Sequence, residues 1–232
     1  GSSYSSSLLV PYNDSQFGAT VYVRMISGLS AGSYNQSATH TGGGAEAQLL
    51  GLSGTVNEPA VYATDLLISE YIEGSSNNKA IEIFNGTGAP VDLSNYKLET
   101  YFNGNSTPTS TFTLNGILAP MDVFVIVNSG SNPNILAVAD TTNNGVINYN
   151  GNDAIALKKI STEAFVDIFG VIGNDPGTAW TADGGYSTQD RTLVRKPTVI
   201  SGVTQNPVGT GATAFTTLDT EWDLYPIDTF SD

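Results

Sequence analysis

Along this chain, a series of Asn-Gly pairs separates short apolar segments. The pairs are Asn85-Gly86, Asn103-Gly104, Asn115-Gly116, Asn144-Gly145 and Asn150-Gly151, and Asp183-Gly184 is a related pair. Asn and Gly tolerate the positive φ angles that tight hairpin turns require. The segments between them are short and rich in Val, Ile, Phe and Tyr, which is typical of β-strands. The spacing therefore predicts an all-β fold, and a β-sandwich in particular.

The chain divides at residues 57–63, where Pro59 cannot donate to a strand ladder. This segment is predicted to be a linker before a domain over residues 64–232. The strands expected in that domain are 65–72, 79–85, 96–102, 109–114, 123–128, 146–148, 154–159, 164–171 and 192–196. One helical turn is expected within 134–139. The runs 122–128 and 165–172 are almost continuously apolar, which indicates strands covered on both faces.

Residues 1–56 are expected to hold four further strands, at 7–10, 19–26, 32–39 and 45–56. Val21, Val23 and Met25 follow a period of two within the second of these. Four strands are too few for a closed sandwich, so this part is interpreted as the C-terminal half of an Ig-like domain. Unpaired strand edges favour pairing with another chain. We therefore expect residues 1–56 either to form a homodimer contact or to pack on the second domain.

The charge pattern excludes several classes of protein. The formal net charge is −14, with 22 acidic and 8 basic residues, whereas binding to a phosphate backbone requires clustered Lys and Arg. Direct nucleic-acid binding is not expected. There is no cysteine, hence no disulfide and no thiolate metal site. No apolar run is long enough to cross a membrane. The start of the chain lacks the pattern of a signal peptide, which we interpret as an internal piece of a longer exported protein.

Few residues suggest reactive or binding chemistry. Residues 140–145 begin like a calcium-binding loop, but the position of the bidentate Glu is taken by Gly151. A looser calcium site made from Asp140, Asn144 and Asp153 stays open, the alternative being a polar loop that satisfies its own backbone. Trp180 and Trp222 could contact a sugar or peptide, or could fasten loops to the core. No catalytic residue and no required cofactor is predicted.

Several segments together resemble the lamin tail domain, over about residues 64–232. They are Ile68-Ser-Glu-Tyr-Ile-Glu-Gly74, Lys79-Ala-Ile-Glu-Ile-Phe-Asn85, Val91-Asp-Leu-Ser-Asn-Tyr-Lys-Leu98, Val123-Phe-Val-Ile-Val-Asn128, Asn150-Gly-Asn-Asp-Ala-Ile-Ala-Leu157 and Val166-Asp-Ile-Phe-Gly170. Three later segments, 173–180, 187–196 and 221–230, are similar to the bacterial branch of the family. The resemblance implies an Ig-like sandwich in exported or surface proteins, often beside nuclease or phosphoesterase domains.

These observations predict a non-catalytic interaction or tethering module of a larger bacterial surface or secreted protein. Its expected partners are other protein domains or a surface matrix, and its expected location is extracellular or at the cell surface. A neighbouring hydrolase would lie outside this chain. The alternative is a β-sandwich that binds calcium or carbohydrate.

Overall fold

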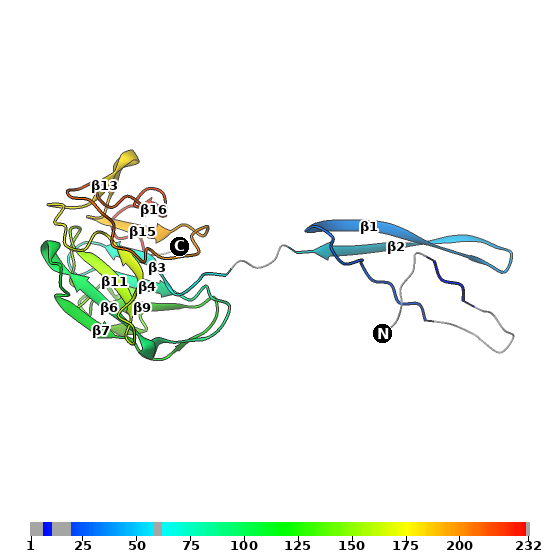
Figure 1. The fold of residues 1–232 in the computed structure, drawn as a ribbon, viewed down its shortest axis with the longest axis horizontal. Helices are drawn as coiled ribbons and strands as arrows, with labels where there is room; N and C mark the ends of the chain where they lie inside the picture. Colours follow the sequence, from blue (N-terminus) through cyan, green and yellow to red (C-terminus); the bar gives the residue numbers. More distant parts are fainter. Residues whose placement is uncertain (1–6, 11–19, 58–61, 231–232) are drawn as a thin grey trace. The chain divides into compact units, whose positions relative to one another are not determined.

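The structure is a computed structural model, and it describes residues 7–10, 20–57 and 62–230 (Figure 1). The chain folds as two compact units, Gly1–Ala60 (unit 1) and Val61–Asp232 (unit 2). The division falls inside the linker predicted at residues 57–63.

Unit 1 consists of one long hairpin and the segments that precede it. Strands β1 (Gly32–Gly42) and β2 (Ala45–Val56) pair antiparallel, from Gly32 opposite Val56 to Gly42 opposite Ala45. Gly43 and Gly44 connect the strands with φ angles of 63° and 76°. Both angles lie in the left-handed region, where only glycine is free of steric cost, so the Gly-Gly pair fixes the reversal of the chain. The strands predicted at 32–39 and 45–56 are confirmed.

Two other predictions for unit 1 are wrong. Residues 7–10 and 20–26 form no strand and belong to no sheet, and residue 19 lies outside the described residues. The alternation of Val21, Val23 and Met25 gave these segments the pattern of a strand. A strand also needs a partner edge, which that pattern cannot supply. Within the described part of unit 1, only β1 and β2 are paired.

Unit 2 contains two main sheets. The larger sheet has the strand order β10-β9-β4-β3-β15-β16, and the smaller has the order β12-β11-β6-β7. Neighbouring strands are antiparallel except β9 and β10. The larger sheet comprises β3 (Leu67–Glu73), β4 (Lys79–Phe84), β9 (Val123–Val127), β10 (Thr141–Thr142), β15 (Arg191–Arg195) and β16 (Trp222–Tyr225). The smaller sheet comprises β6 (Tyr96–Tyr101), β7 (Ser110–Thr113), β11 (Ala154–Lys159) and β12 (Phe165–Phe169).

Short elements connect these strands. Two small ladders pair β5 (Val91–Asp92) with β8 (Ile117–Leu118), and β13 (Thr181–Ala182) with β14 (Tyr186–Ser187). The helical turns are η1 (Leu93–Asn95), η2 (Phe102–Gly104), η3 (Asp183–Gly185) and α1 (Pro133–Leu136). Among the described residues, no helix is long and apolar enough to span a membrane.

The main core of unit 2 lies between the two sheets. Alternate residues of both sheets point into it, and an aromatic stack runs through its centre. Tyr71 stacks on Phe169 with ring centroids 4.2 Å apart and on Tyr149 at 4.9 Å, while Phe215 and Trp222 meet Phe169 edge-on. Aromatic contacts of this kind contribute beyond their buried area. The two packed sheets confirm the predicted Ig-like β-sandwich.

A second, smaller core covers the outer face of the larger sheet. It contains Ile72, Ala80, Val127 and Ile135, the last from α1. Val127 therefore packs on this side of β9, while its neighbour Ile126 packs in the main core. Strand β9 is almost continuously apolar because both of its faces are covered. The predicted coverage on both faces is confirmed for this strand.

The strand predicted at 146–148 is absent. Val146 and Ile147 are completely buried, but side chains bind their carbonyl groups in place of a strand ladder. The Thr100 hydroxyl donates to the Val146 carbonyl at 2.9 Å, and the Asn128 amide donates to the Ile147 carbonyl at 2.6 Å. Hydroxyl and amide side chains can bond backbone carbonyls in place of a neighbouring strand. The apolar pattern of the sequence does not reveal such bonds.

Candidate interaction surfaces

Trp180 and Trp222 lie in the main core of unit 2. The Trp180 ring is completely buried and the Trp222 ring is 1% exposed. Trp222 meets the edge of Phe169 at 5.2 Å, and the Arg195 guanidinium lies 4.8 Å from its ring centroid. Trp180 packs edge-on against Phe215, with ring centroids 6.1 Å apart. Neither ring has a free face for a ligand, so the expectation that they line a binding groove is corrected. They anchor the C-terminal segments to the sandwich.

The three calcium candidates each serve a different backbone segment. Asp140 accepts from the Val125 N–H at 2.8 Å. Asn144 accepts from the Ser129 N–H at 2.8 Å and donates to the Ser129 hydroxyl at 2.8 Å. Asp153 is 2% exposed and uses both carboxylate oxygens on backbone N–H groups. Across the residues described, no cluster of three or more acidic, His or Cys side chains could hold a metal ion. In the structure these three side chains cap separate loops, and the calcium site stays a prediction.

A buried ion pair joins the two sheets of unit 2. Arg195 of β15 places its guanidinium 2.9 Å from Asp167 of β12 and 2.7 Å from Glu221. Asp167 is fully buried and also accepts from the N–H groups of Ile68 and Val203, each at 2.9 Å. Burial raises the pKa of the Asp167 carboxyl, and the Arg195 charge together with the backbone donors opposes this rise.

Asp167 has this role because β3 and β15 stop pairing before Ile68. The last paired residue of β3 in this direction is Glu70, opposite Val194, and the register of β3 against β4 also shifts between Ile68 and Glu70. The Ile68 N–H therefore needs another acceptor, because a buried unpaired donor is costly. The Asp167 carboxylate supplies it across the sandwich. All of its oxygens are engaged in holding the fold, which leaves none for acid–base chemistry.

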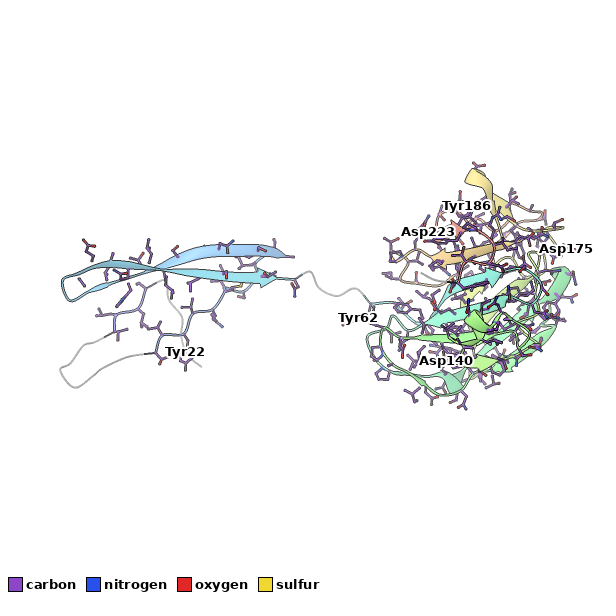
Figure 2. The ribbon with its side chains drawn as sticks, turned by 180° about the vertical axis from the view of Figure 1, so that it is seen from behind. Tyr22, Tyr62, Asp140, Asp175, Tyr186 and Asp223 are labelled. Carbon is purple, nitrogen blue, oxygen red and sulfur yellow. The ribbon has the colours of Figure 1, made fainter. Side chains whose placement is uncertain are left out.

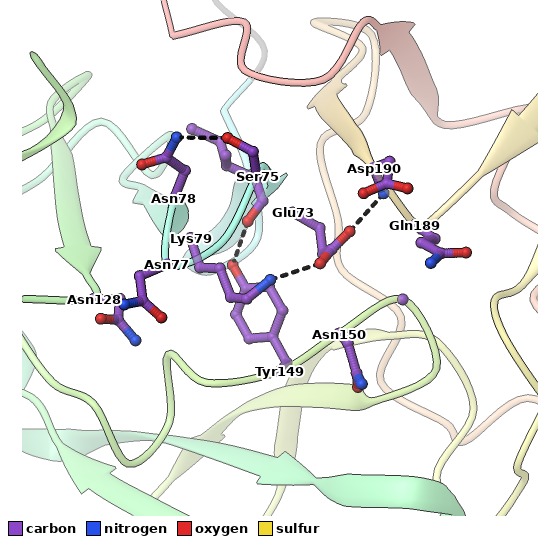
Figure 3. Close-up of polar contacts among 12 residues, drawn as sticks. Glu73, Ser75, Asn77, Asn78, Lys79, Asn128, Tyr149, Asn150, Gln189 and Asp190 are labelled. Carbon is purple, nitrogen blue, oxygen red and sulfur yellow. Dashed lines mark hydrogen bonds and ion pairs between the residues drawn. The ribbon is translucent and has the colours of Figure 1, made fainter. Parts of the chain in front are cut away.

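A second buried pair lies at the other end of β3 (Figure 3). Glu73 and Lys79 are opposite each other on β3 and β4, and the Lys79 Nζ lies 2.6 Å from a Glu73 oxygen. The other Glu73 oxygen accepts from the Asp190 N–H, which fixes the turn before β15. The Lys79 ammonium also lies 6.0 Å from the Tyr149 ring centroid. This pair connects three segments of unit 2 and has a structural role.

A third charged group lies on the outer face of the smaller sheet. Glu163 is exposed, and its carboxylate lies 2.8 Å from the ammonium groups of both Lys97 and Lys158. The same two lysines also contact the buried Glu99. The hydrogen bonds from Lys158 and Lys97 lower the pKa of Glu163 to about 2. The cluster is therefore neutral in sum, with two lysines against two glutamates.

Residues 59–173 match the family model of the lamin tail domain. Unit 2 carries a lamin tail domain. This family consists of non-catalytic Ig-like sandwich domains that often mediate interactions. No curated protein and no solved structure matches the chain.

The folded lamin tail domain extends beyond the matched residues. The match ends at Gly173, yet β15 lies between β3 and β16 inside the larger sheet. Leu193, Phe215 and Trp222 also come from this later part, and all are buried in the main core. The segment after Gly173 is therefore an integral part of the sandwich.

The surface of the lamin tail domain is acidic because its basic groups are already paired. Residues 61–232 contain 19 of the 22 acidic residues and 7 of the 8 basic ones. Lys79, Lys97, Lys158, Lys159 and Arg195 form ion pairs inside the domain. The remaining two, Lys196 and Arg191, donate to backbone carbonyls. Part of the excess negative charge lies on exposed loops, and Figure 2 labels Asp140 and Asp175 among these acids.

Unit 1 has the opposite character, with many exposed apolar side chains and few charges. In its described part the exposed fraction reaches 90% for Leu9, 79% for Tyr22, 57% for Val23 and 60% for Leu50. Side chains alternate along β2, so Leu50 shares one face with Leu52 and Val56, while Leu49 lies on the opposite face. Partial coverage of the first face comes from residues before β1. Met25 packs against Gly54, where an added Cβ would lie 2.5 Å from the Met25 sulfur.

Proposed function

We propose that the chain is a non-catalytic contact module of a larger extracellular or cell-surface bacterial protein. In this proposal it tethers a neighbouring hydrolase, of the nuclease or phosphoesterase type, that lies elsewhere in the parent protein. The observation that carries the proposal is the apolar face of unit 1, formed by Leu50, Leu52 and Val56 and by the segment around Val23. The interaction role of the lamin tail domain family supports it.

The hairpin of unit 1 gives the physical reason for a contact role. An isolated two-stranded hairpin is marginally stable in water, because it buries little apolar surface. Apolar area removed from water contributes roughly 25 cal/mol per Å². A partner that covers the Leu50 face would therefore stabilise unit 1 and be held by it. We propose that the partner is a second copy of unit 1. This unit contains only 3 acidic residues and 1 basic residue, so two copies repel each other weakly.

The lamin tail domain supplies an acidic surface in this proposal. Its lysines and arginines are already engaged within the domain, so a nucleic acid would meet negative charge without free cations to release its counterions. We propose that its partners are proteins or a surface matrix, and that nucleic acid is not among them.

The contact role is tested with two adjacent leucines of β2. Leu50→Ser removes apolar surface from the proposed contact face, and Leu49→Ser makes the same change on the opposite face. Light scattering should show dimers for the wild type and for Leu49→Ser, and monomers for Leu50→Ser. A wild-type monomer at high concentration, or equal effects of the two variants, would contradict dimerisation through this face.

The non-catalytic role needs a separate assay. The purified chain should show no turnover of DNA, RNA or phosphate esters with magnesium, manganese or calcium added. Metal-dependent cleavage that follows the chain through successive purification steps would refute this part of the proposal.

A carbohydrate ligand is the second candidate, and one observation favours it. A surface hollow is lined by Phe165 together with the polar side chains Thr204, Gln205 and Glu163. Partly exposed aromatic rings beside amide groups suit the apolar and polar faces of a sugar. Binding on a glycan array that is lost in Phe165→Ala, with an unchanged melting temperature, would support this candidate. Retained binding in that variant would remove the hollow as its site.

A further inference from the structure

The structure separates the five Asn-Gly pairs of the chain by their freedom to react. An asparagine followed by glycine can deamidate, because the glycine nitrogen can reach the asparagine side chain without hindrance from a β-carbon. The reaction requires a free side-chain amide, a free glycine N–H and a backbone that can move. Asparagine is among the thermolabile residues for this reason. All five pairs lie in the lamin tail domain, so one molecule contains its own controls.

Asn115-Gly116 meets the three requirements. It lies between β7 and β8, both residues are exposed, and Gly116 has a φ of 107° with nothing within 4 Å of an added Cβ. Among the residues described, none is hydrogen-bonded to the Asn115 side chain or to the Gly116 N–H. The Leu114 N–H donates to the Tyr96 carbonyl at 3.0 Å, and the Gly116 carbonyl accepts from the Leu93 N–H at 2.9 Å. The segment is held at both ends while the reacting groups stay free.

Two of the other pairs are locked by their side chains. Asn85 is fully buried, and its amide donates to three backbone carbonyls at 2.8 to 3.0 Å. Asn144 bonds Ser129 with both ends of its side chain, and the Gly145 N–H is already donated to Asn143. Reaction at either pair requires local opening of the domain, which lowers the rate in proportion to the open population.

The remaining two pairs are held through their backbone. A Cβ added to Gly104 would lie 2.6 Å from Asp175, and a Cβ added to Gly151 would lie 2.7 Å from Gln189. Both glycines are therefore tightly packed. The N–H groups of Asn103 and Asn150 are both bonded to Asp153, at 2.8 and 2.9 Å; Figure 3 shows Asn150 near the Glu73–Lys79 pair. Neither asparagine can rotate its backbone freely towards the glycine nitrogen.

We propose that Asn115 is the site of spontaneous deamidation in this protein. The Gly116 nitrogen loses its proton and attacks the Asn115 side-chain carbonyl carbon, so that a C–N bond forms. The bond to the side-chain –NH2 breaks, and ammonia leaves. Water then opens the cyclic imide to give aspartate or isoaspartate. The product adds a negative charge beside β8, and the isoaspartate form adds a methylene to the main chain.

The test is a time course on the intact wild-type chain at mildly alkaline pH in heavy-oxygen water. Peptide mapping by mass spectrometry follows each Asn-Gly pair, and the heavy oxygen marks hydrolysis of the imide. We expect Asn115 to react at least about tenfold faster than Asn85 and Asn144, because those two require local opening. In concentrated urea all five rates should become similar. Equal rates in the folded chain, no labelled product at Asn115, or an undiminished lead of Asn115 in urea would overturn the proposal.

Discussion

Replacing Asp167 by Asn tests whether the buried carboxylate joins the two sheets. The substitution keeps the shape of the side chain and removes its charge, so Arg195 loses its fully buried partner and keeps only the partly exposed Glu221. Asn also turns one acceptor into a donor, which faces the N–H of Ile68, the N–H of Val203 or the guanidinium. Removing one member of a buried ion pair typically costs about 3–5 kcal/mol, and one unsatisfied buried N–H costs about 1–3 kcal/mol. Because the two penalties overlap, we expect a loss of about 4 kcal/mol.

Urea unfolding followed by tryptophan fluorescence measures this loss directly. Both tryptophans of the chain are buried in unit 2, so the signal reports on the domain that contains Asp167. With a slope of about 2 kcal/mol per M, the midpoint should fall by about 2 M.

The matched control is Asp183→Asn on an exposed turn, which should stay within about 0.5 kcal/mol of wild type. In the double variant Asp167→Asn, Arg195→Met, part of the stability should return, since the guanidinium is then absent from the core and the carboxylate that loses it, Glu221, is partly exposed. A loss below about 1 kcal/mol for Asp167→Asn, with an unchanged slope, would refute the role assigned to this pair.

Three further outcomes are expected. Gly170→Ala should destabilise the domain by about 2 kcal/mol or more in urea unfolding, because φ is 84° and an added Cβ would lie 2.7 Å from the Trp180 ring; an unchanged midpoint would contradict this packing. Glu163 has a lowered pKa in the folded state because of Lys158, so its contribution to stability is present above its unfolded pKa and is lost as the pH falls through about 2. The urea midpoints of wild type and Glu163→Gln should therefore converge over this acidic range, and a constant difference would exclude the pairing. Millimolar calcium should not raise the melting temperature, since each of the three candidate ligands already accepts at least one backbone N–H group; a reproducible rise would support the calcium site.

The strands that the sequence predicted best are those with dense apolar patterning between clear turn residues. The ranges 45–56 and 154–159 agree with β2 and β11 in both bounds, and 79–85 differs from β4 by one residue. Strand β16 was not predicted, since it has only four residues and is followed by Pro226. Its partner β15 lies far back in the chain, and short-range patterning contains no information on that pairing.

The roles of single polar and aromatic residues were hard to predict for a related reason. Asp, Asn and Trp side chains have the same local pattern whether they bind a ligand or satisfy their own fold. Asp153 illustrates this, because its two oxygens cap two loops that are 50 and 3 residues away in sequence. The role of Arg195 depends on a partner 28 residues distant and on a missing strand contact at Ile68. Such roles follow from tertiary contacts, which one sequence does not display.

The position of β15 inside the larger sheet has a consequence for how the protein is made. Tyr71 of β3 bonds to Thr188, which lies 117 residues later in the chain and just before β15, so β3 lacks its neighbouring strand until the ribosome has added most of the domain. Contacts between such distant residues form late and slowly. Newly made chains should therefore stay loosely structured until β15 and β16 have emerged and the sandwich can close.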